Sequence, residues 1–314
     1  MSSLQSSSPV LAKLWRWLRR LLKLMLTLVL TLVVLVALLA VWSVLVEPRW
    51  VAKRTFDVPV PGWQGPAGLK VVVASDWHIA QQARHVMTVQ RAAAIVRDIN
   101  ATEPDVVLLP GDFIFGRGED GTTAGQIASV LGQLKARHGV YAVLGNHDWW
   151  TNGPKLTEAL QAAGVRVLHN ESVRLPGTSV WVVGIGDRTT GHSDPAGALR
   201  GLPANAQTLT FMHDPASARL LPRGRGLTVA AHTHGGQVWL PGYGSIVAPH
   251  GWPRRQTHGW VRIGRREVYI TSGLGVSIYP VRFNMRPEWV MFTLKPAVRP
   301  EQTAGSGAAG AGGG

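Results

Sequence analysis

The sequence predicts an α/β fold in which two packed, mixed β-sheets are flanked by helices and preceded by one transmembrane helix. Between residues 69 and 294, short β-branched runs alternate with helical patterns. The early strand–helix–strand order predicts a mostly parallel sheet, whereas the later strands follow one another closely, as in hairpins. An uncharged run over residues 24–46 precedes all of them and predicts the membrane-spanning helix.

The apolar runs divide the chain into expected elements. Strands are expected at residues 69–75, 105–109, 139–144, 179–185, 208–212, 227–231, 267–271 and 288–294. Helices are expected at residues 85–100, 122–137, 155–163 and 215–221. One folded domain would span residues 69–298. Residues 47–68 would be a linker, whose Pro- and Gly-rich part also fits a first edge strand, and residues 299–314 would be a flexible Gly/Ala tail.

Positive charge concentrates at the N-terminus. The chain of 314 residues has a formal net charge of +14, and half of it lies in residues 1–54, where eight Lys and Arg face the single acid Glu47. The rest of the chain is only mildly basic and shows no basic stripe with interleaved aromatic residues, so we expect no nucleic-acid partner. The sequence contains no cysteine, which excludes a thiol nucleophile, thiolate metal ligands and disulfides.

The N-terminal apolar run is long enough to cross a bilayer. As a helix, the 23 residues of 24–46 cover roughly 35 Å, against a hydrocarbon core of about 30 Å. The length argues against a buried core helix and a cleaved signal peptide, so an uncleaved anchor is expected. Residues 1–23 form a basic amphipathic segment suited to anionic headgroups. Five basic residues precede the run and three follow it, which favours a domain outside the cytoplasm.

Polar clusters follow five of the expected strands directly. Their candidate metal ligands are Asp76, His78, Asp112, Asn146, His213, His232 and His234. Each cluster alone also fits a helix cap or a turn. Because the carboxyl ends of parallel strands meet at one edge of a sheet, all five clusters should converge. Nitrogen and oxygen donors without sulfur suit Mn, Fe, Zn or Ni, and seven ligands suit two divalent ions that share a carboxylate.

The order of these clusters carries a resemblance to a known family. The blocks "DWH", "GD", "GNHD", "H" and "HTH" occur in the order found in the calcineurin-like metallophosphoesterase superfamily. The stretches "HTHGGQVWLPGYG" and "SGLGVSIYPVRFNMRPE" resemble its membrane-associated bacterial branch, so the likeness covers residues 69–294. It implies a bacterial cytoplasmic-membrane protein. One departure is Ala231, which stands where the superfamily has glycine.

The resemblance implies a role for each block. Asp76, His78 and His234 would bind the first metal ion. Asn146, His213 and His232 would bind the second, and Asp112 would bridge the two. His147 would contact the phosphoryl group and protonate the leaving oxygen, while Asp148 would orient that imidazole or cap the next helix. A hydroxide bridging the metals would attack phosphorus.

The expected function is therefore a membrane-anchored, dimetal phosphoesterase, and we expect a phosphodiesterase that acts on a phospholipid or lipid-linked substrate. A pyrophosphatase of the kind that cleaves UDP-diacylglucosamine in lipid A synthesis is an alternative, which an extracytoplasmic domain would disfavour. A nuclease and a catalytically silent metal-binding scaffold are further alternatives. The sequence leaves the oligomeric state open.

Several other residues invite weaker predictions. Trp149 and Trp150 could stack on substrate or cover the domain edge. Arg282 could contact a phosphate, although a structural role is favoured. His250 and His258 could face substrate. The remaining histidines are expected to be ordinary surface residues: His85, His138, His169 and His192.

Overall fold

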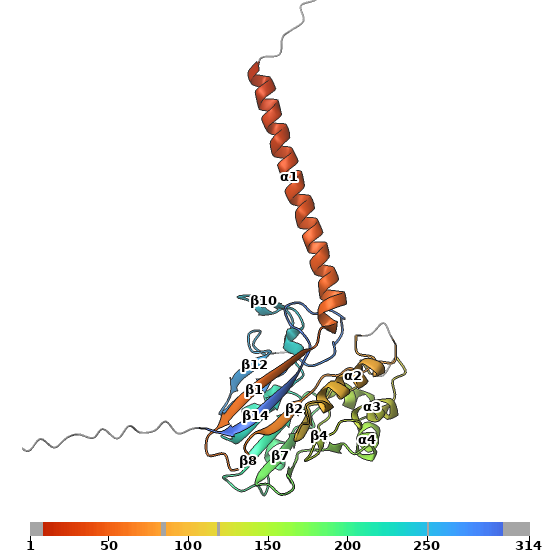
Figure 1. The fold of residues 1–314 in the computed structure, drawn as a ribbon, viewed down its shortest axis with the longest axis vertical. Coiled ribbons are helices and arrows are strands. Elements are labelled where there is room, and N and C mark those ends of the chain that lie inside the picture. Colours follow the sequence, from red (N-terminus) through yellow and green to blue (C-terminus); the bar gives the residue numbers. More distant parts are fainter. Residues whose placement is uncertain (1–8, 83–85, 118–119, 250, 298–314) are drawn as a thin grey trace, which may run out of the picture.

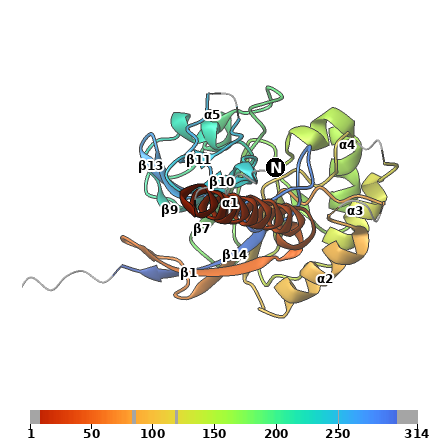
Figure 2. The same cartoon turned by 90° about the horizontal axis from the view of Figure 1, so that it is seen from above.

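Two six-stranded β-sheets packed face to face form the centre of the molecule (Figure 1). This computed structural model describes residues 9–82, 86–117, 120–249 and 251–297. Helices cover the outside of the sheets, and one long N-terminal helix projects from the folded domain (Figures 1 and 2). The predicted α/β sandwich preceded by an apolar helix is confirmed.

The first sheet has the strand order β1-β14-β2-β3-β4-β5. Its strands are β1 (Ala52–Val60), β2 (Leu69–Val73), β3 (Val106–Leu109), β4 (Val140–Ala142), β5 (Arg166–Val167) and β14 (Glu288–Pro296). Strand β14 runs antiparallel to β2, and the other neighbouring strands are parallel. The carboxyl ends of β2, β3 and β4 therefore meet at one edge of this sheet.

The second sheet has the strand order β12-β13-β9-β8-β7-β6. Its strands are β6 (Glu171–Arg174), β7 (Val180–Ile185), β8 (Gln207–Met212), β9 (Arg225–Ala230), β12 (Gly259–Ile263) and β13 (Arg266–Ile270). The outer pairs β12–β13 and β6–β7 are antiparallel, and the central strands are parallel. A separate small hairpin pairs β10 (Trp239–Leu240) with β11 (Gly244–Ser245).

Alternating side chains divide the interior into layers. Val71 and Val73 of β2 pack against the second sheet, in the same cluster as Phe211. Val72 points the other way, into the cluster that includes Ile95 of the covering helices. These helices are α2 (Val89–Asn100), α3 (Ala124–Leu131) and α4 (Asn146–Ala162). The short helix α5 (Pro195–Ala198) and the 3-10 helix η3 (Pro215–Leu220) pack on the outer face of the second sheet. Strands buried on both faces explain the continuous apolar runs in the sequence.

Helix boundaries follow local capping chemistry. Helix α2 begins after Thr88, whose side chain accepts the Arg91 N–H, later than the predicted start at residue 85. Helix α3 begins after Thr123, which forms a capping box with Gln126. It ends before Gly132, so residues 132–137 of the predicted helix are not helical.

Helix α4 differs most from its prediction. It was expected over residues 155–163 but begins at Asn146, directly after Gly145. A kink at Asn152, which has extended backbone (φ −166°, ψ 80°), separates its first turns from the part beginning near Pro154. Because a proline usually marks the start of a helix, Pro154 made the sequence pattern indicate a helix that begins only after it. The "NHD" residues consequently occupy the N-terminus of a helix rather than a loop.

The predicted linker at residues 47–68 is corrected by strand β1. Its residues pair in parallel with β14 over nine positions, from Ala52 opposite Glu288 to Val60 opposite Pro296. The edge-strand alternative therefore applies to this part, because an edge position tolerates Pro59 and exposed side chains. Strand β12 was not predicted, since only Val261 and Ile263 of its five residues are buried.

The N-terminal helix α1 (Pro9–Val41) continues into a π-helical turn, η1 (Trp42–Val46), and a 3-10 turn, η2 (Glu47–Arg49). No break separates the basic segment from the apolar run at residues 23 and 24. Among the described residues, this is the one helix whose length and composition suit a membrane span. The predicted tail at residues 299–314 lies outside the described residues.

Candidate metal centre

The seven predicted ligands come together at the carboxyl edges of the two sheets. Asp76 and His78 follow β2, Asp112 follows β3, and Asn146 opens α4 after β4. The second sheet supplies the other three ligands: His213 after β8, and His232 and His234 after β9. All of them are buried except His232, which is half-buried. The packing of the two sheets therefore places donors from both on one centre.

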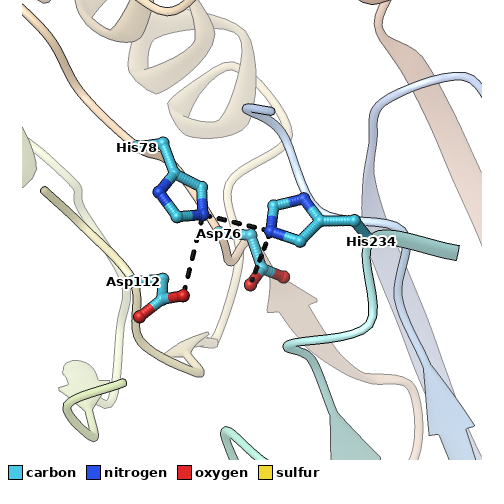
Figure 3. A group of neighbouring side chains, drawn as sticks. All are labelled: Asp76, His78, Asp112 and His234. Carbon is cyan, nitrogen blue, oxygen red and sulfur yellow. Dashed lines mark hydrogen bonds and ion pairs between the residues drawn. The ribbon is translucent and has the colours of Figure 1, made fainter. Parts of the chain in front are cut away.

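Four of these residues form the first group of donor atoms. The ligand atoms of Asp76, His78, Asp112 and His234 all lie within 4.8 Å of one another. The Nε2 atoms of His78 and His234 are 3.0 Å apart, and the side chains point toward one centre in Figure 3. His78 Nε2 lies 3.6 Å from Asp112 Oδ2, and His234 Nε2 lies 3.6 Å from Asp76 Oδ1.

A second group shares Asp112 with the first. Ligand atoms of Asp112, His213 and His232 also lie within 4.8 Å of one another. His213 Nε2 is 3.0 Å from His232 Nδ1, 3.0 Å from Asn146 Oδ1 and 3.3 Å from Asp112 Oδ2. The Oδ2 atom of Asp112 therefore borders both groups. This is the placement that a bridging carboxylate requires.

The electrostatics of the two groups suit cations. Burial lowers the pKa of His78 to about 3 and that of His234 well below its usual value, so both rings are neutral at pH 7. Neutral imidazole is the form that binds metal. Burial and the neighbouring Asp112 raise the pKa of Asp76 to about 6. Burial opposes the charge of His213, yet Asp112 and Asp76 raise its pKa well above the usual value. Two carboxylates this deeply buried need nearby positive charge.

Second partners orient several ligands. The Nδ1 atom of His213 lies 2.8 Å from the Pro110 carbonyl, which directs Nε2 to the centre. Ser75 Oγ donates to Asp76 Oδ2 over 2.9 Å. Gly273 has a positive φ of 67°, and a Cβ there would lie 2.5 Å from the Asp76 Cβ. Sequence reasoning missed these three residues. Ser75 directly precedes Asp76, whereas only the folded chain brings Pro110 to His213 and Gly273 to Asp76.

His147 lies beside the two groups on the first turn of α4. Its N–H donates to Asp112 Oδ1 over 2.9 Å, and its ring is edge-on to that of His78, with centroids 4.8 Å apart. The Nδ1 atom contacts the Gly116 carbonyl, so Nε2 is the ring nitrogen left for a substrate. Half-exposed among buried ligands, this imidazole is placed to exchange a proton with a bound ester.

The predicted catalytic role of Asp148 needs correction. Its carboxylate accepts four backbone N–H groups, from Asp112 and Gly145 at Oδ2 and from Phe113 and Ile114 at Oδ1. Two roles were predicted for it, orienting the imidazole or capping the helix, and the hydrogen bonds are those of a cap at the start of α4. Asp148 is thus a positioning residue that joins the Asp112 loop to the start of α4, and the Gly116 carbonyl is what contacts the imidazole of His147.

The two tryptophans after this cluster have different surroundings. Trp149 stacks on His192, with ring centroids 3.6 Å apart, and packs edge-on to His169, so it covers the domain edge. His192 is accordingly half-buried rather than an ordinary surface residue. Trp150 is 45% exposed beside the ring of His147, with Arg117 5.3 Å from its own ring. Only Trp150 therefore lies where a substrate could reach it.

The remaining weaker predictions resolve simply. Arg282 is fully buried and donates to the carbonyls of Gly275, Ser272 and Met285, which is the structural role. His258 lies 3.0 Å from Glu288 Oε1 instead of facing the metal ligands. His138 is half-buried, as His192 is, rather than fully exposed. His85 and His250 lie outside the described residues.

One basic feature was not visible in the sequence. A cavity of about 1030 Å³ between the edges of the two sheets is lined by Arg223, Arg225, Arg262 and Arg265, with Glu267 and Asp57. These arginines form two pairs that are close in sequence, Arg223 with Arg225 and Arg262 with Arg265, and the fold brings the two pairs together. The cavity shares no lining residue with the predicted ligands. It is therefore not the groove beside the centre that a nuclease reading would require.

Comparison with known proteins agrees with the geometry. Residues 69–243, more than half of the chain, match the model of the calcineurin-like phosphoesterase family. The chain belongs to this family. Phosphodiesterase YaeI of Escherichia coli (strain K12) is 33% identical, over 61% of this chain and 71% of that protein. The metallophosphoesterase YkuE of Bacillus subtilis (strain 168) is 28% identical, over 73% and 79% respectively.

A relative from Bos taurus matches a larger share of the chain. It is named a transmembrane protein with metallophosphoesterase domain, and it is 31% identical over 83% of this chain. The match covers 61% of that longer protein. Family membership makes this calcineurin-like phosphoesterase a metal-dependent phosphoester hydrolase with a dimetal centre. The two donor groups are the part of the structure that fits such a centre.

Proposed function

We propose that this chain is a membrane-anchored, dimetal phosphodiesterase whose substrate is a phospholipid or another lipid-linked phosphodiester. The observation that carries the proposal is the pair of donor groups sharing Asp112 with the half-exposed ring of His147 beside them. The kinship with a bacterial phosphodiesterase supports diester hydrolysis, and the apolar helix α1 supports a lipid-side substrate.

Each side chain has a specific part in the proposed reaction. Asp76, His78 and His234 would hold one ion, Asn146, His213 and His232 would hold the other, and Asp112 would contact both. Two ions bound here would supply positive charge for the phosphate oxygens and a hydroxide nucleophile near neutral pH. His147 would give the proton on Nε2 to the leaving oxygen. Asp148 would fix the position of Asp112 relative to His147, because its carboxylate accepts the backbone N–H groups of Asp112 and Gly145.

Metal reconstitution tests this proposal. The detergent-solubilised full chain is stripped with a chelator, reloaded with Mn, Fe, Zn or Ni, and assayed on a chromogenic phosphodiester. We expect hydrolysis only after loading, with two ions per chain. The variant Asp112→Ala should lose both metal and activity, because its carboxylate borders both groups. Two bound ions without hydrolysis would instead support a silent scaffold, and full loading of Asp112→Ala would overturn the ligand assignment.

The anchor and its orientation form a separate part of the proposal. We propose that residues 24–46 span the bacterial cytoplasmic membrane once, with the catalytic domain outside, since more basic residues precede the span than follow it. Because the chain has no native cysteine, Leu220→Cys gives one exposed thiol on the domain. A membrane-impermeant maleimide should label it in intact spheroplasts. Labelling only after lysis would place the domain in the cytoplasm and favour the lipid A alternative.

A further inference from the structure

Two loops beside the end of the N-terminal helix expose a cluster of large apolar side chains. Ile278 and Tyr279 are 77% and 70% exposed, and the β10–β11 hairpin with the residues after it exposes Tyr243, Ile246 and Val247. We call these five residues the apolar rim. The hairpin lies beside the lower end of α1 (Figure 1), where Trp239 of β10 lines a cavity together with Trp42 and Glu47. Apolar side chains gathered in this way mark an interaction surface.

Hydrogen bonds hold the rim loop against the helix end. The Arg282 N–H donates to the Ser43 carbonyl over 2.9 Å, and the Met285 N–H donates to Glu47 Oε1 over 2.6 Å. A hydrocarbon core of about 30 Å takes about 20 helical residues, and a span counted from Leu24 reaches that length at Ser43. The loop is therefore attached at the level where the hydrocarbon core ends.

The composition of the rim matches a bilayer surface. Tyrosine and tryptophan favour the headgroup region, and Trp42 and Trp50 lie with their rings 5.8 Å apart at the same end of the helix. The segments 237–258 and 272–287 contain no Asp or Glu in their sequence. They contribute Arg254 and Arg255, both exposed. Cationic side chains at this level attract anionic lipid headgroups.

Folding alone does not account for the rim loop. Ile278 is a β-branched residue with a positive φ of 62°, a conformation that costs of order 1–3 kcal/mol, yet its side chain is mostly exposed. Gln237 holds the backbone there: its side chain accepts the Ser277 N–H and donates to the Tyr279 and Val281 carbonyls. Its own N–H donates to the carbonyl of the ligand His234. The exposed loop and the metal centre are thus parts of one hydrogen-bonded unit.

We propose that the apolar rim inserts into the headgroup region of an anionic bilayer and holds the metal centre at the membrane surface. This rests on the proposed membrane anchor and adds a second, independent contact with the same bilayer. The rim fixes the domain against rotation and tilting about the end of α1. Phosphodiesters at the lipid surface then lie within reach of the centre, because one hydrogen-bonded segment connects Tyr279 to His234 through Gln237.

Single-cysteine probes test the rim in the full chain. Ile278→Cys reports on the rim, Leu32→Cys on the anchor, and Leu220→Cys is the matched control, an exposed leucine on η3 at 67% against 77% for Ile278. Each variant carries an environment-sensitive fluorophore in vesicles of phosphatidylglycerol and phosphatidylethanolamine. Lipids brominated high on the acyl chain serve as quenchers for the probe at 278. Lipids brominated at mid-chain serve for the probe at 32, which lies roughly 12 Å inside a span counted from Leu24. The probe at 220 is measured with both. We expect quenching of the probes at 32 and 278 that is several-fold stronger than at 220.

The outcomes separate the rim from the anchor. A probe at 278 that is quenched no more than the probe at 220, while the probe at 32 is quenched, overturns the rim and leaves the anchor in place. Absent quenching at both 32 and 278 overturns both. A fluorophore at 278 that is shielded from water but not quenched by lipid indicates a protein partner and also overturns the proposal. Tyr279→Cys repeats the measurement, so that the answer does not depend on the strained position.

Discussion

Backbone conformation at single residues distinguishes the metal centre from the rest of the domain. Five of the seven proposed ligands have positive φ: Asp76 (48°), His78 (45°), Asp112 (54°), His232 (71°) and His234 (51°). Each such residue costs of order 1–3 kcal/mol, so the surrounding fold must stabilise them. Sharp turns directly after the strands direct these side chains to one point. The strain is therefore part of how the centre is assembled.

His147 is the residue whose replacement best separates chemistry from metal binding. His147→Ala should retain both ions, since the contact of this residue with Asp112 is through its backbone N–H, which alanine keeps. Loss of the proton donor should lower kcat by about 10²–10⁴-fold for esters with poor leaving groups. A nitrophenyl ester, whose leaving group needs no proton, should be affected much less. Elemental analysis with kcat on both substrates checks this, and equal losses on the two would argue against proton donation.

The link between β3 and α4 belongs to the scale of elements. Asp148 fastens the loop after β3 to the first turn of α4 through four backbone N–H groups. In Asp148→Asn, the amide NH₂ would face N–H donors, so the free energy of unfolding should fall by about 2–3 kcal/mol. The metal affinity should fall with it, because Asp112 and Asn146 lie on the two joined segments.

A matched control distinguishes this link from an ordinary cap. Asp194→Asn makes the same change at the start of α5, where the carboxylate accepts the Gly197 N–H, on a segment that holds none of the proposed ligands. It should cost only a few tenths of a kcal/mol, because asparagine caps a helix about as well as aspartate, and leave metal affinity unchanged. Denaturant unfolding and metal titration of both variants check the comparison. An equal metal affinity in the two variants would contradict a positioning role for Asp148.

The elements show why some of the structure was predictable and some was not. Strands such as β2 and β8 are buried on both faces, so their apolar runs are visible without knowledge of their neighbours. Strand β1 is an exposed edge strand and looks like a linker until β14 pairs with it. The grouping of the proposed ligands was predictable because each follows a strand end closely in the sequence. The partners Gly116, Pro110 and Gly273 were not, because folding alone brings them there.

The pairing of β1 with β14 gives the fold a pH dependence. Burial alone would raise the pKa of Glu288, but contacts with His258 and Arg54 outweigh it and lower the pKa to about 2 from 4.5. A carboxyl group with a depressed pKa stabilises the fold above its unfolded pKa, and this contribution disappears as the pH falls through the folded value. Glu288 should therefore stabilise the domain fully above pH 4.5 and progressively less toward pH 2.

Comparison with Glu288→Gln measures this contribution. The wild type should exceed the variant most in free energy of unfolding above pH 4.5, and the difference should shrink by about 3 kcal/mol as the pH falls to 2. Denaturant unfolding across this range, on metal-free protein, gives the difference directly. Glu267→Gln, at an exposed glutamate of β13, is the control and should behave as wild type. A difference independent of pH would show that Glu288 acts through packing rather than charge.

At the scale of the molecule, one segment of the chain connects the metal centre to the end of the N-terminal helix. The segment that follows β13 passes the Asp76 loop, where the Gly275 N–H donates to the Asp76 carbonyl. It then reaches Ser43 through Arg282 and returns as β14. One stretch of about 17 residues, 271–287, thus contacts the metal centre, the rim and the helix end in turn. A bilayer bound at the helix end and the rim would therefore have a defined position relative to the centre.

If the rim inserts into the bilayer as proposed, activity should depend on whether the substrate lies in a bilayer. Replacing Ile278 and Tyr279 together by Asp should weaken binding to the bilayer surface by roughly 1–2 kcal/mol. The apparent KM for a phosphodiester presented in anionic vesicles should therefore rise about tenfold. Hydrolysis of a soluble chromogenic diester should be unchanged, because neither side chain belongs to the donor groups. Leu220→Asp, an exposed control on η3, should alter neither activity. Parallel kinetics on the two substrates decide the matter: a loss confined to vesicles supports a surface-acting enzyme, and an equal loss on both would mean that the loop merely supports the fold of the centre.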